Sequence, residues 1–264
     1  MPNLDWKQIL SIFFNSNSID CTHKKKFLPS IIDFQDTLGS SLFEQLIYLH
    51  DYIMLFVVVI LILVGWTMLA CIFNKHYHKY FSHNTAIEII WICIPGFILF
   101  LIGIPSLTLL YWVEEILITP LVIKVTGHQW YWDYEYSNVF SNSCEPVQFD
   151  SYMVPHEDLE KGDIRLLQVD SSLHLPEGVG TRFLVTSSDV IHCFTVPTLG
   201  IKADAMPGRI NDLSVITWRC GLYYGQCSEI CGADHPFMPI VVRVVDFEEF
   251  TNWLTELSEY ESEA

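Results

Sequence analysis

Basic residues are scarce in this sequence: 14 lysines and arginines stand against 31 aspartates and glutamates, giving a formal net charge of −17. The sequence also contains no glycine-rich phosphate-binding loop and no basic patch. A field of this sign repels nucleic acid, and it attracts cationic partners and raises their encounter rate. We therefore expect no nucleic-acid partner. From Asp246 onward there are seven acids and no base, which is typical of a solvated helix and tail.

Charged side chains are absent from two long apolar runs, residues 52–73 and 89–113. Each run exceeds the roughly 20 apolar residues that cross the hydrocarbon core of a bilayer. Two buried helices of a soluble protein are the alternative, but uncharged runs of this length fit it poorly. We predict a transmembrane hairpin, in which neighbouring helices tolerate the kinks expected at Pro95 and Pro105.

The short segment 74–86 between the two runs holds two lysines and three histidines but no acid. The positive-inside rule places such a loop on the cytoplasmic or matrix side. Both termini then face the periplasm or the intermembrane space.

Residues 121–245 contain short runs rich in β-branched residues, separated by stretches with turn chemistry. The predicted strands include LVIKVTG, IRLLQVD, TRFLVTSS, SVITWRC and PIVVRVV. Many short strands at this spacing indicate an antiparallel sandwich or a Greek-key barrel. The last stretch, FEEFTNWLTELSEYESEA, is predicted to form an amphipathic helix.

The segment 225–238, GQCSEICGADHPFM, concentrates soft metal-binding side chains. On an oxidising side of a membrane, Cys227 and Cys231 could form a disulfide. However, His235 and Met238 follow within ligand reach, and the glycines and proline of the segment disfavour a helix. The pattern therefore favours a metal site.

The donor set discriminates between metals. A structural zinc site would use two cysteines and two histidines, with His192 as the fourth ligand, but zinc has no use for Met238. A blue-copper site takes two histidines, one cysteine and a weak axial methionine. The additional thiolate lets two thiolates bridge two coppers, each completed by one histidine. The weak axial positions then fall to the methionine and to a backbone carbonyl.

Six stretches, in order, resemble the subunit 2 family of cytochrome c oxidase, the heme–copper oxidase subunit that carries the dinuclear copper (CuA) centre. They are FQDTLGSSLFEQLIYLHDY, the apolar hairpin, GHQWYWDYEY, FDSYMVP, DVIHCFTVPTLGIKADAMPGR and GLYYGQCSEICGADHPFMPI. The resemblance runs from Phe34 to near Trp253. It implies two transmembrane helices followed by an all-β cupredoxin-like Greek-key barrel.

The resemblance also implies a division of the chain. Residues 1–33 would be a leader or an extension, and residues 34–115 would hold the N-terminal segment and the hairpin. The CuA domain would span residues 116–247, and residues 248–264 would form the C-terminal helix and acidic tail.

The metal ligands follow from the same resemblance. They are Cys227 and Cys231 as bridges, His192 and Met238 for one copper, and His235 with the main-chain carbonyl of Glu229 for the other. The alternatives are a histidine with a purely structural role at a strand end and a methionine that fills the core. The carboxylate of Glu229 is further implied to bind magnesium at the contact with the catalytic subunit, since hard oxygen ligands suit that ion. Alternatively, Glu229 is a surface acid that offers only its carbonyl.

The stretch GHQWYWDYEY alternates, which places His128, Trp130, Trp132 and Tyr134 on one face and Tyr131, Asp133 and Glu135 on the other. We expect Trp132 and Tyr134 to lie in the barrel core. By resemblance, Trp130 is the exposed point where electrons arrive from cytochrome c, with Tyr131 next to it.

Four acids match the docking patch of the family: Glu135, Asp150, Asp170 and Asp189. Carboxylates at a rim steer the encounter with the lysines of cytochrome c and raise its rate more than its affinity. The alternative for each is a plain solvated surface acid.

Glu88 stands at the start of the second apolar run. An acid in the first turn of a helix is favoured by the dipole whatever the function. The resemblance instead places this position at the mouth of a proton-conducting channel, and ionisable groups at a membrane boundary are functional candidates. Both interpretations stay open.

Two features depart from the family pattern. The first thirty residues precede the resemblance, and Asp5 and the short apolar core ILSIFF suit a signal peptide poorly. Cys193 adjoins His192, where a residue without a thiol is expected. It would be a buried bystander or would perturb the copper site.

The implied function is electron transfer within an enzyme complex. Electrons would pass from cytochrome c to two coppers and on to heme in the catalytic subunit, where oxygen is reduced and protons are pumped. Partners would also include accessory subunits and the lipid bilayer. The location would be the mitochondrial inner membrane, with the N-terminus and the C-terminal domain in the intermembrane space, although an alphaproteobacterial source stays open. The alternatives are a membrane-anchored structural zinc module, a quinol-oxidase-type subunit without copper, and the copper domain of nitrous oxide reductase.

Overall fold

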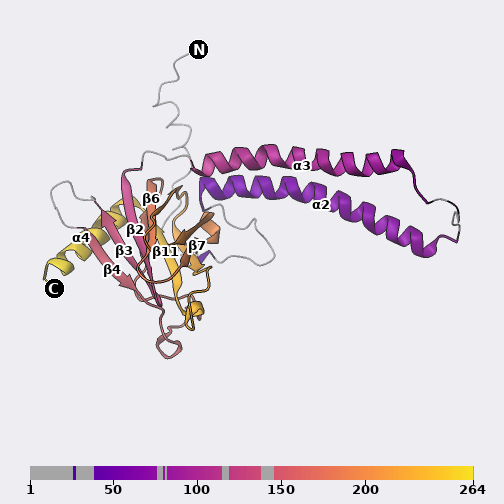
Figure 1. Cartoon of the computed structure of the whole chain (residues 1–264). Coiled ribbons are helices and arrows are strands. Elements are labelled where there is room, and N and C mark those ends of the chain that lie inside the picture. The colour runs from indigo at the N-terminus through magenta and orange to yellow at the C-terminus, as the bar shows by residue number, and fades with distance from the viewer. Residues whose placement is uncertain are drawn as a thin grey trace, which may run out of the picture. The chain divides into compact units, whose positions relative to one another are not determined.

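The computed structural model describes residues 26–27, 39–75, 80, 82–114, 119–137 and 146–263 (Figure 1). The chain divides into two compact units: residues 42–116 form one, and residues 117–264 together with 1–41 form the other. Apart from the backbone of residues 26–27, the predicted leader or extension lies outside the described residues.

The first unit is a hairpin of two helices, α2 (Ser41–Phe73) and α3 (Thr85–Glu114). At 1.5 Å per residue each helix is longer than the roughly 30 Å of hydrocarbon in a bilayer. The two helices contact each other where the Tyr52 hydroxyl donates a hydrogen bond of 3.4 Å to the Leu101 carbonyl. Both predicted spans lie within these helices.

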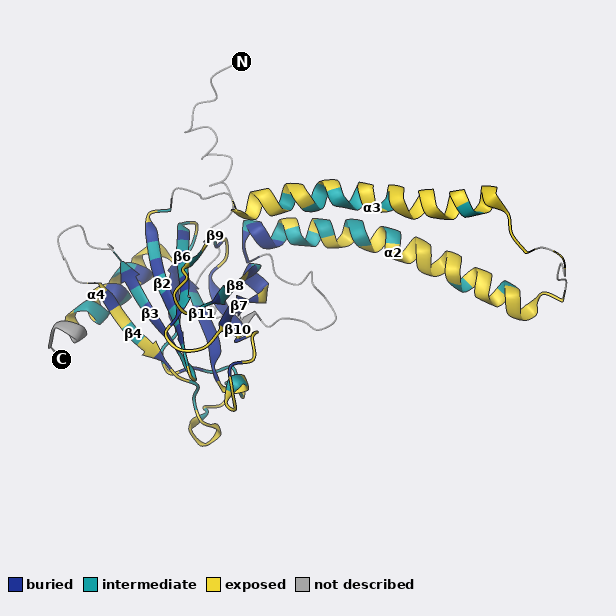
Figure 2. Ribbon diagram, in the orientation of Figure 1, coloured by how far each residue is buried: buried dark blue, intermediate teal, exposed yellow. Residues whose placement is uncertain are grey.

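The apolar side chains of the hairpin are exposed along most of its length (Figure 2). Leu61 is 68% exposed and Trp66 is 70% exposed, and the most apolar window of each helix buries no residue. Soluble proteins do not leave apolar surface of this extent in water. Both helices are long and apolar enough to cross a membrane, as the sequence predicts.

In the described residues, the second unit is built from three β-sheets. A five-stranded sheet has the order β4 (Val147–Ser151), β3 (Tyr131–Ser137), β2 (Leu121–His128), β6 (Gly180–Ser187) and β9 (Asn211–Ile216). A four-stranded sheet has the order β1 (Lys26–Phe27), β10 (Gly221–Gln226), β11 (Pro239–Val245) and β5 (Leu173–Pro176). Strands β7 (His192–Val196) and β8 (Ile201–Ala205) form a separate pair. Short 3-10 helices span η1 (His156–Asp158), η2 (Pro197–Leu199) and η3 (His235–Phe237).

The sheets enclose an aromatic core. Trp132, Tyr134, Phe183 and Phe194 are fully buried, and the Trp132 ring packs edge-on against Phe194 at 5.4 Å. The hydroxyl of Tyr136 on β3 donates to the His174 carbonyl on β5 at 2.8 Å, which joins the two larger sheets. The prediction that Trp132 and Tyr134 lie in the core is confirmed.

The two larger sheets are mixed and not purely antiparallel, which corrects the predicted antiparallel pairing. Strand β2 pairs in parallel with β6, β5 with β11, and β1 with β10. Side-chain alternation has the same period of two in both kinds of pairing, so it cannot reveal the direction of a neighbouring strand.

Two predicted strands are wrong. The stretch IRLLQVD, residues 164–170, consists of turns, with Leu166 at φ 68° and a single bridge from Val169 to Met153. Its apolar residues pack onto a cluster formed with Leu222, Tyr224 and Val241, which accounts for a strand-like composition without a strand ladder. The stretch GHQWYWDYEY is a hairpin that turns at residues 129–130 and not one strand.

The C-terminal helix α4 (Phe247–Glu263) confirms the predicted amphipathic helix. Asp246 caps it by accepting a hydrogen bond of 2.8 Å from the Glu249 main-chain N–H. Phe250 and Leu254 are buried, and the Trp253 ring stacks on His174 with centroids 4.0 Å apart. The helix therefore packs on the β-domain through one apolar face.

Candidate metal centre

The predicted donor side chains come from separate elements. His192 is the first residue of β7, and Cys227 and Cys231 lie in the loop that follows β10. His235 begins the 3-10 helix η3, and Met238 directly precedes β11. No α-helix forms in this loop, as its glycines and proline predict.

These donors converge around the two thiols. The Sγ atoms of Cys227 and Cys231 are 4.0 Å apart, and His192 Nδ1 lies 3.9 Å from Cys227 Sγ. On the other side, Cys231 Sγ lies 3.4 Å from His235 Nδ1 and 3.5 Å from Met238 Sδ. The structure thus brings together all five side chains that the sequence predicts as copper ligands.

The main-chain carbonyl of Glu229 joins the same cluster, 3.3 Å from Cys227 Sγ. Its side chain is exposed, so the carboxylate is free to face another molecule. The two functions implied for Glu229 therefore use different atoms of the residue.

Four of the donor side chains in this cluster are buried, unlike groups of metal-binding residues on a protein surface. His192 is fully buried, Met238 is 1% exposed, Cys227 is 7% exposed and Cys231 is 4% exposed. Both cysteines are free, because their sulfurs are about twice as far apart as in a disulfide. The disulfide alternative is not what the structure forms.

The two thiols differ in acidity because their hydrogen bonds and neighbouring charges differ. Burial opposes ionisation of Cys227, but hydrogen bonds with His192 and with main-chain groups outweigh it and lower its pKa to about 7. Burial and the neighbouring Cys227 raise the pKa of Cys231 to about 12. A bound metal removes this difference, since a coordinating thiol is deprotonated outright.

The far nitrogen of the His192 ring is also held. Its Nε2 lies 2.8 Å from Oδ1 of Asp189, which leaves Nδ1 facing Cys227. Metal-binding histidines typically donate their other ring N–H to such a carboxylate, which fixes the tautomer and the ring orientation. The sequence suggests Asp189 only as a docking acid, and no sequence pattern points to this contact.

Gln129 connects the turn of the β2–β3 hairpin to the cysteine loop. Its side-chain amide donates to the Cys231 carbonyl at 2.8 Å, and its main-chain N–H donates to Asp189 at 2.6 Å. Trp132 makes a similar hydrogen bond, in which its Nε1 donates to the Met238 carbonyl at 3.2 Å. These bonds hold the backbone of the loop, and sequence analysis misses both roles.

Gly232 allows the loop to approach Trp130. It adopts φ 129°, and a Cβ atom there would lie 3.0 Å from Cζ2 of the Trp130 ring. Trp130 is half-buried, not exposed as predicted, because this loop covers part of its indole. The ring thus lies directly beside the segment that carries Cys231.

The residues present fit copper. Among the described residues, one histidine and two cysteines, His192, Cys227 and Cys231, have ligand atoms that all lie within 4.8 Å of one another. Thiolate, imidazole and thioether donors suit copper, and the closely placed Met238 sulfur has no role in a zinc site. The set is therefore compatible with copper.

Cys193 does not belong to the cluster. Its side chain is fully buried and its Sγ lies 3.4 Å from Thr195 Oγ1. Burial raises the pKa of this thiol to about 11. Because side chains alternate along a strand, Cys193 points to the opposite face of β7 from His192.

Three of the predicted docking residues gather around Tyr152, which is 44% exposed. The Tyr131 ring stacks on Tyr152 at 4.6 Å, and the Tyr152 hydroxyl donates to Asp150 at 3.3 Å. Asp170 accepts a hydrogen bond of 2.9 Å from the Tyr152 main-chain N–H.

Two of the predicted docking acids, Glu135 and Asp189, bind other residues of this chain. The predicted proton-channel residue Glu88 belongs to the helical unit. The carboxylate of Glu135 pairs with Lys124 at 2.8 Å, and that of Asp189 accepts from His192 and Gln129. Glu88 lies in the first turn of α3, one turn after Asn84, which caps the helix through its side-chain oxygen.

Comparison with known proteins matches both units to one family. A family model for the periplasmic domain of cytochrome c oxidase subunit II matches residues 121–245, and one for its transmembrane domain matches residues 28–109. Cytochrome c oxidase subunit 2 of Neurospora crassa is 48% identical over 234 residues, covering 86% of this chain and 93% of the relative. The Metridium senile protein of the same name is 47% identical over 211 residues, covering 80% and 84%.

Among solved structures, the periplasmic domain of subunit II of cytochrome oxidase from Bradyrhizobium japonicum is 41% identical, with a TM-score of 0.49. It covers 55% of this chain and 99% of that structure. The relatives are subunits of an oxidoreductase complex, which confirms the predicted enzyme class. The chain belongs to the cytochrome c oxidase subunit II family.

Proposed function

We propose that this chain receives electrons from cytochrome c at a dinuclear copper centre and passes them to heme in the catalytic subunit of the oxidase. The observation that carries the proposal is the convergence of two buried free thiols with two imidazoles and a thioether. When bound, the copper pair supplies a site at which one electron is shared between two metals. No bond of a substrate is made or broken by this chain.

Five side chains and one main-chain carbonyl of this chain would bind the two copper ions. Cys227 and Cys231 would be ligands of both ions, His192 and Met238 would complete the ligands of one, and His235 and the main-chain carbonyl of Glu229 would complete those of the other. Because Asp189, Gln129 and Trp132 brace the surrounding groups by hydrogen bonds, the donors keep their positions when the charge of the site changes. A site whose geometry does not reorganise suits fast electron transfer.

Trp130 is the proposed point where electrons arrive. Its ring lies against Gly232, next to Cys231 in the chain, which supports a short path from the surface to the thiols. Tyr131, Asp150 and Asp170 would dock cytochrome c, because carboxylates there attract its lysines. Asp189 and Glu135 would contribute to the field of the patch, although their oxygens are also engaged within this chain.

Two further roles extend the proposal to the complex. The exposed carboxylate of Glu229 would bind magnesium against the catalytic subunit, since that hard ion prefers oxygen. Glu88 would stand at the mouth of a proton channel on the matrix side. The chain would lie in the mitochondrial inner membrane with its β-domain in the intermembrane space, beside accessory subunits of the oxidase.

Copper stoichiometry and electron paramagnetic resonance on the full chain in detergent test this function. We expect two coppers per chain and hyperfine splitting from one electron shared over both nuclei. Cys227→Ser should abolish that spectrum, while Cys193→Ser, its matched control, should retain it. One copper with a blue-copper spectrum, or zinc in place of copper, would contradict the dinuclear site. Zinc would support the structural-module alternative, and the absence of any metal would support the quinol-oxidase type.

A further inference from the structure

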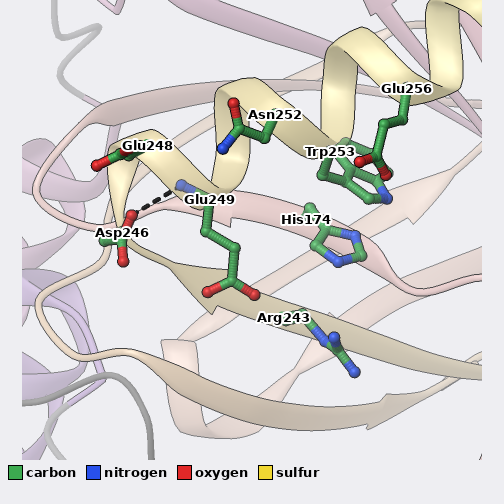
Figure 3. Close-up of a pocket in the computed structure, with 8 residues that line it drawn as sticks. All are labelled: His174, Arg243, Asp246, Glu248, Glu249, Asn252, Trp253 and Glu256. Atoms are coloured by element: carbon green, nitrogen blue, oxygen red, sulfur yellow. Dashed lines mark hydrogen bonds between the residues drawn. The ribbon is translucent and has the colours of Figure 1, made fainter.

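A second site lies where α4 crosses strands β5 and β11. The structure contains a pocket of about 450 Å³ there, and none of the metal donors lines it (Figure 3). Its wall on the helix side carries the acids Asp246, Glu248, Glu249 and Glu256, and its floor carries His174 and Arg243. Pockets of this size accommodate organic groups.

The acidic wall is not neutralised within the described part of the chain. None of its four carboxylates forms an ion pair with a described residue, and the one hydrogen bond they accept comes from the Glu249 main-chain N–H to Asp246. Arg243 is the one cation among the lining residues. The pocket therefore attracts a positively charged group.

His174 adds a hydrogen-bond acceptor to the lining of the pocket. The residue is 8% exposed, its Nδ1 lies 2.9 Å from the Ser172 carbonyl, and its ring stacks on Trp253. The carbonyl can only accept, so Nδ1 carries the proton and Nε2 presents a lone pair. No described residue donates to Nε2. Burial lowers the pKa of His174 to about 4, so the imidazole remains a neutral acceptor at pH 7.

Arg243, in contrast, needs a hydrogen-bond acceptor. Its Nε is buried without a hydrogen-bond partner among the described residues. Buried donors are nearly always satisfied, so the guanidinium calls for an acceptor. An inorganic or small organic cation brings donors or charge but no acceptor, whereas a polypeptide brings a carbonyl beside each side chain.

A metal ion fits this pocket poorly. The lining histidine and acids are not among the described groups whose ligand atoms lie within 4.8 Å of one another. Glu249 and Glu256 stand two turns apart on α4, on either side of Trp253 along the same helix face. That spacing suits an elongated cation better than one ion.

We propose that this pocket binds a lysine or arginine side chain from a basic segment of a partner polypeptide. The cationic head lies between Glu249 and Glu256 and donates to Nε2 of His174. A main-chain carbonyl of the same segment accepts from the Arg243 guanidinium. This surface belongs to α4 and the strands beneath it, and the proposal does not depend on copper or on electron transfer.

Fluorescence anisotropy with a labelled Gly-Gly-Lys-Gly-Arg-Gly-Gly peptide tests it on the full chain in detergent at low salt. We expect saturable binding that Glu249→Gln/Glu256→Gln weakens at least fivefold. The matched control is Glu157→Gln/Asp158→Asn, which removes the same two charges from η1, outside the pocket. It should change the dissociation constant by less than twofold. Equal weakening in both variants would show attraction by net charge alone and overturn the proposal.

A site-specific readout guards against misfolded variants. With 5-fluorotryptophan incorporated, the fluorine resonance of Trp253, assigned from Trp253→Phe, should shift on addition of the basic peptide. A peptide with glutamine at both basic positions should leave it unchanged. Failure of the unmodified chain to bind the basic peptide, or binding without a shift at Trp253, also overturns the proposal.

Discussion

The Nε2 atom of His192 lies 2.8 Å from Oδ1 of Asp189, while the other ring nitrogen faces Cys227. Asp189 is itself fixed by hydrogen bonds from the main-chain N–H groups of Gln129 and Val190. Burial opposes its charge, but these bonds and the one from His192 outweigh it and lower the pKa of Asp189. The carboxylate thus positions a metal ligand.

We predict that Asp189→Asn weakens copper binding about tenfold, at the lower end of the range for such supporting groups, because the amide still accepts a hydrogen bond but carries no charge. Asp189→Ala should weaken it further. Titration of the copper-loaded full chain against a chelator measures the affinity. Asp170→Asn, which makes the same charge change away from His192, should leave the affinity unaltered. If the two variants behave alike, Asp189 has no positioning role.

Gly232→Ala should displace the Trp130 ring or the cysteine loop. The new Cβ would lie 3.0 Å from the indole on a backbone at φ 129°, a conformation that L side chains rarely adopt. We expect a loss of about 1–3 kcal/mol in the free energy of unfolding, together with slower reduction by cytochrome c. Gly162→Ala is the control, because φ is 104° there and a Cβ would meet open space. Slower reduction should be confined to Gly232→Ala, as stopped-flow measurements will reveal.

Neutralising Asp150 and Asp170 together, by Asp150→Asn/Asp170→Asn, should lower the association rate with cytochrome c several-fold at low ionic strength. The difference should shrink as salt rises, since surface charges are screened beyond about 8 Å at physiological ionic strength. Glu157→Gln/Glu160→Gln removes two exposed acids elsewhere and serves as the reference. A rate change of the same size in the reference pair would assign the effect to net charge and not to the surface around Tyr152.

The buried His174 predicts a dependence of stability on pH. Its pKa is lowered to about 4 in the folded chain, mainly by burial, against an ordinary value of about 6.5 when unfolded. The unfolded chain therefore takes up a proton that the folded chain refuses, and stability is lost as pH falls from 6.5 to 4. The loss is on the order of 3 kcal/mol at 1.4 kcal/mol per pKa unit.

Chemical denaturation of the full chain at several pH values measures this loss. In His174→Leu, the part of the slope due to this residue should vanish between pH 6.5 and 4, even if the variant is less stable throughout. An undiminished slope in that variant would mean that other groups cause the dependence.

Local chemistry could be predicted from the sequence wherever neighbours in the chain are also neighbours in space. Cys227, Cys231, His235 and Met238 occupy one short loop, so their types and spacing already indicate a soft metal. The two apolar runs predict their helices, because lipid selects for length and lack of charge. The amphipathic pattern after Asp246 likewise predicts α4.

Contacts between distant segments depend on strand pairing, which sequence alternation does not encode. The error over GHQWYWDYEY shows this, because a continuous alternation concealed the turn at residues 129–130. The stretch IRLLQVD failed for a related reason: its apolar residues pack on a sheet without pairing in it.

By itself, the sequence determined that this chain has a membrane hairpin, an acidic β-domain and a loop of soft donors, because each is written in consecutive residues. Only the tertiary structure decided that His192 reaches that loop from 35 residues away and that Asp189 holds its ring. It also brought His174 and Arg243 from parallel strands beneath the acids of α4. Such groupings arise from the pairing and packing of whole elements, so no local pattern of residues records them.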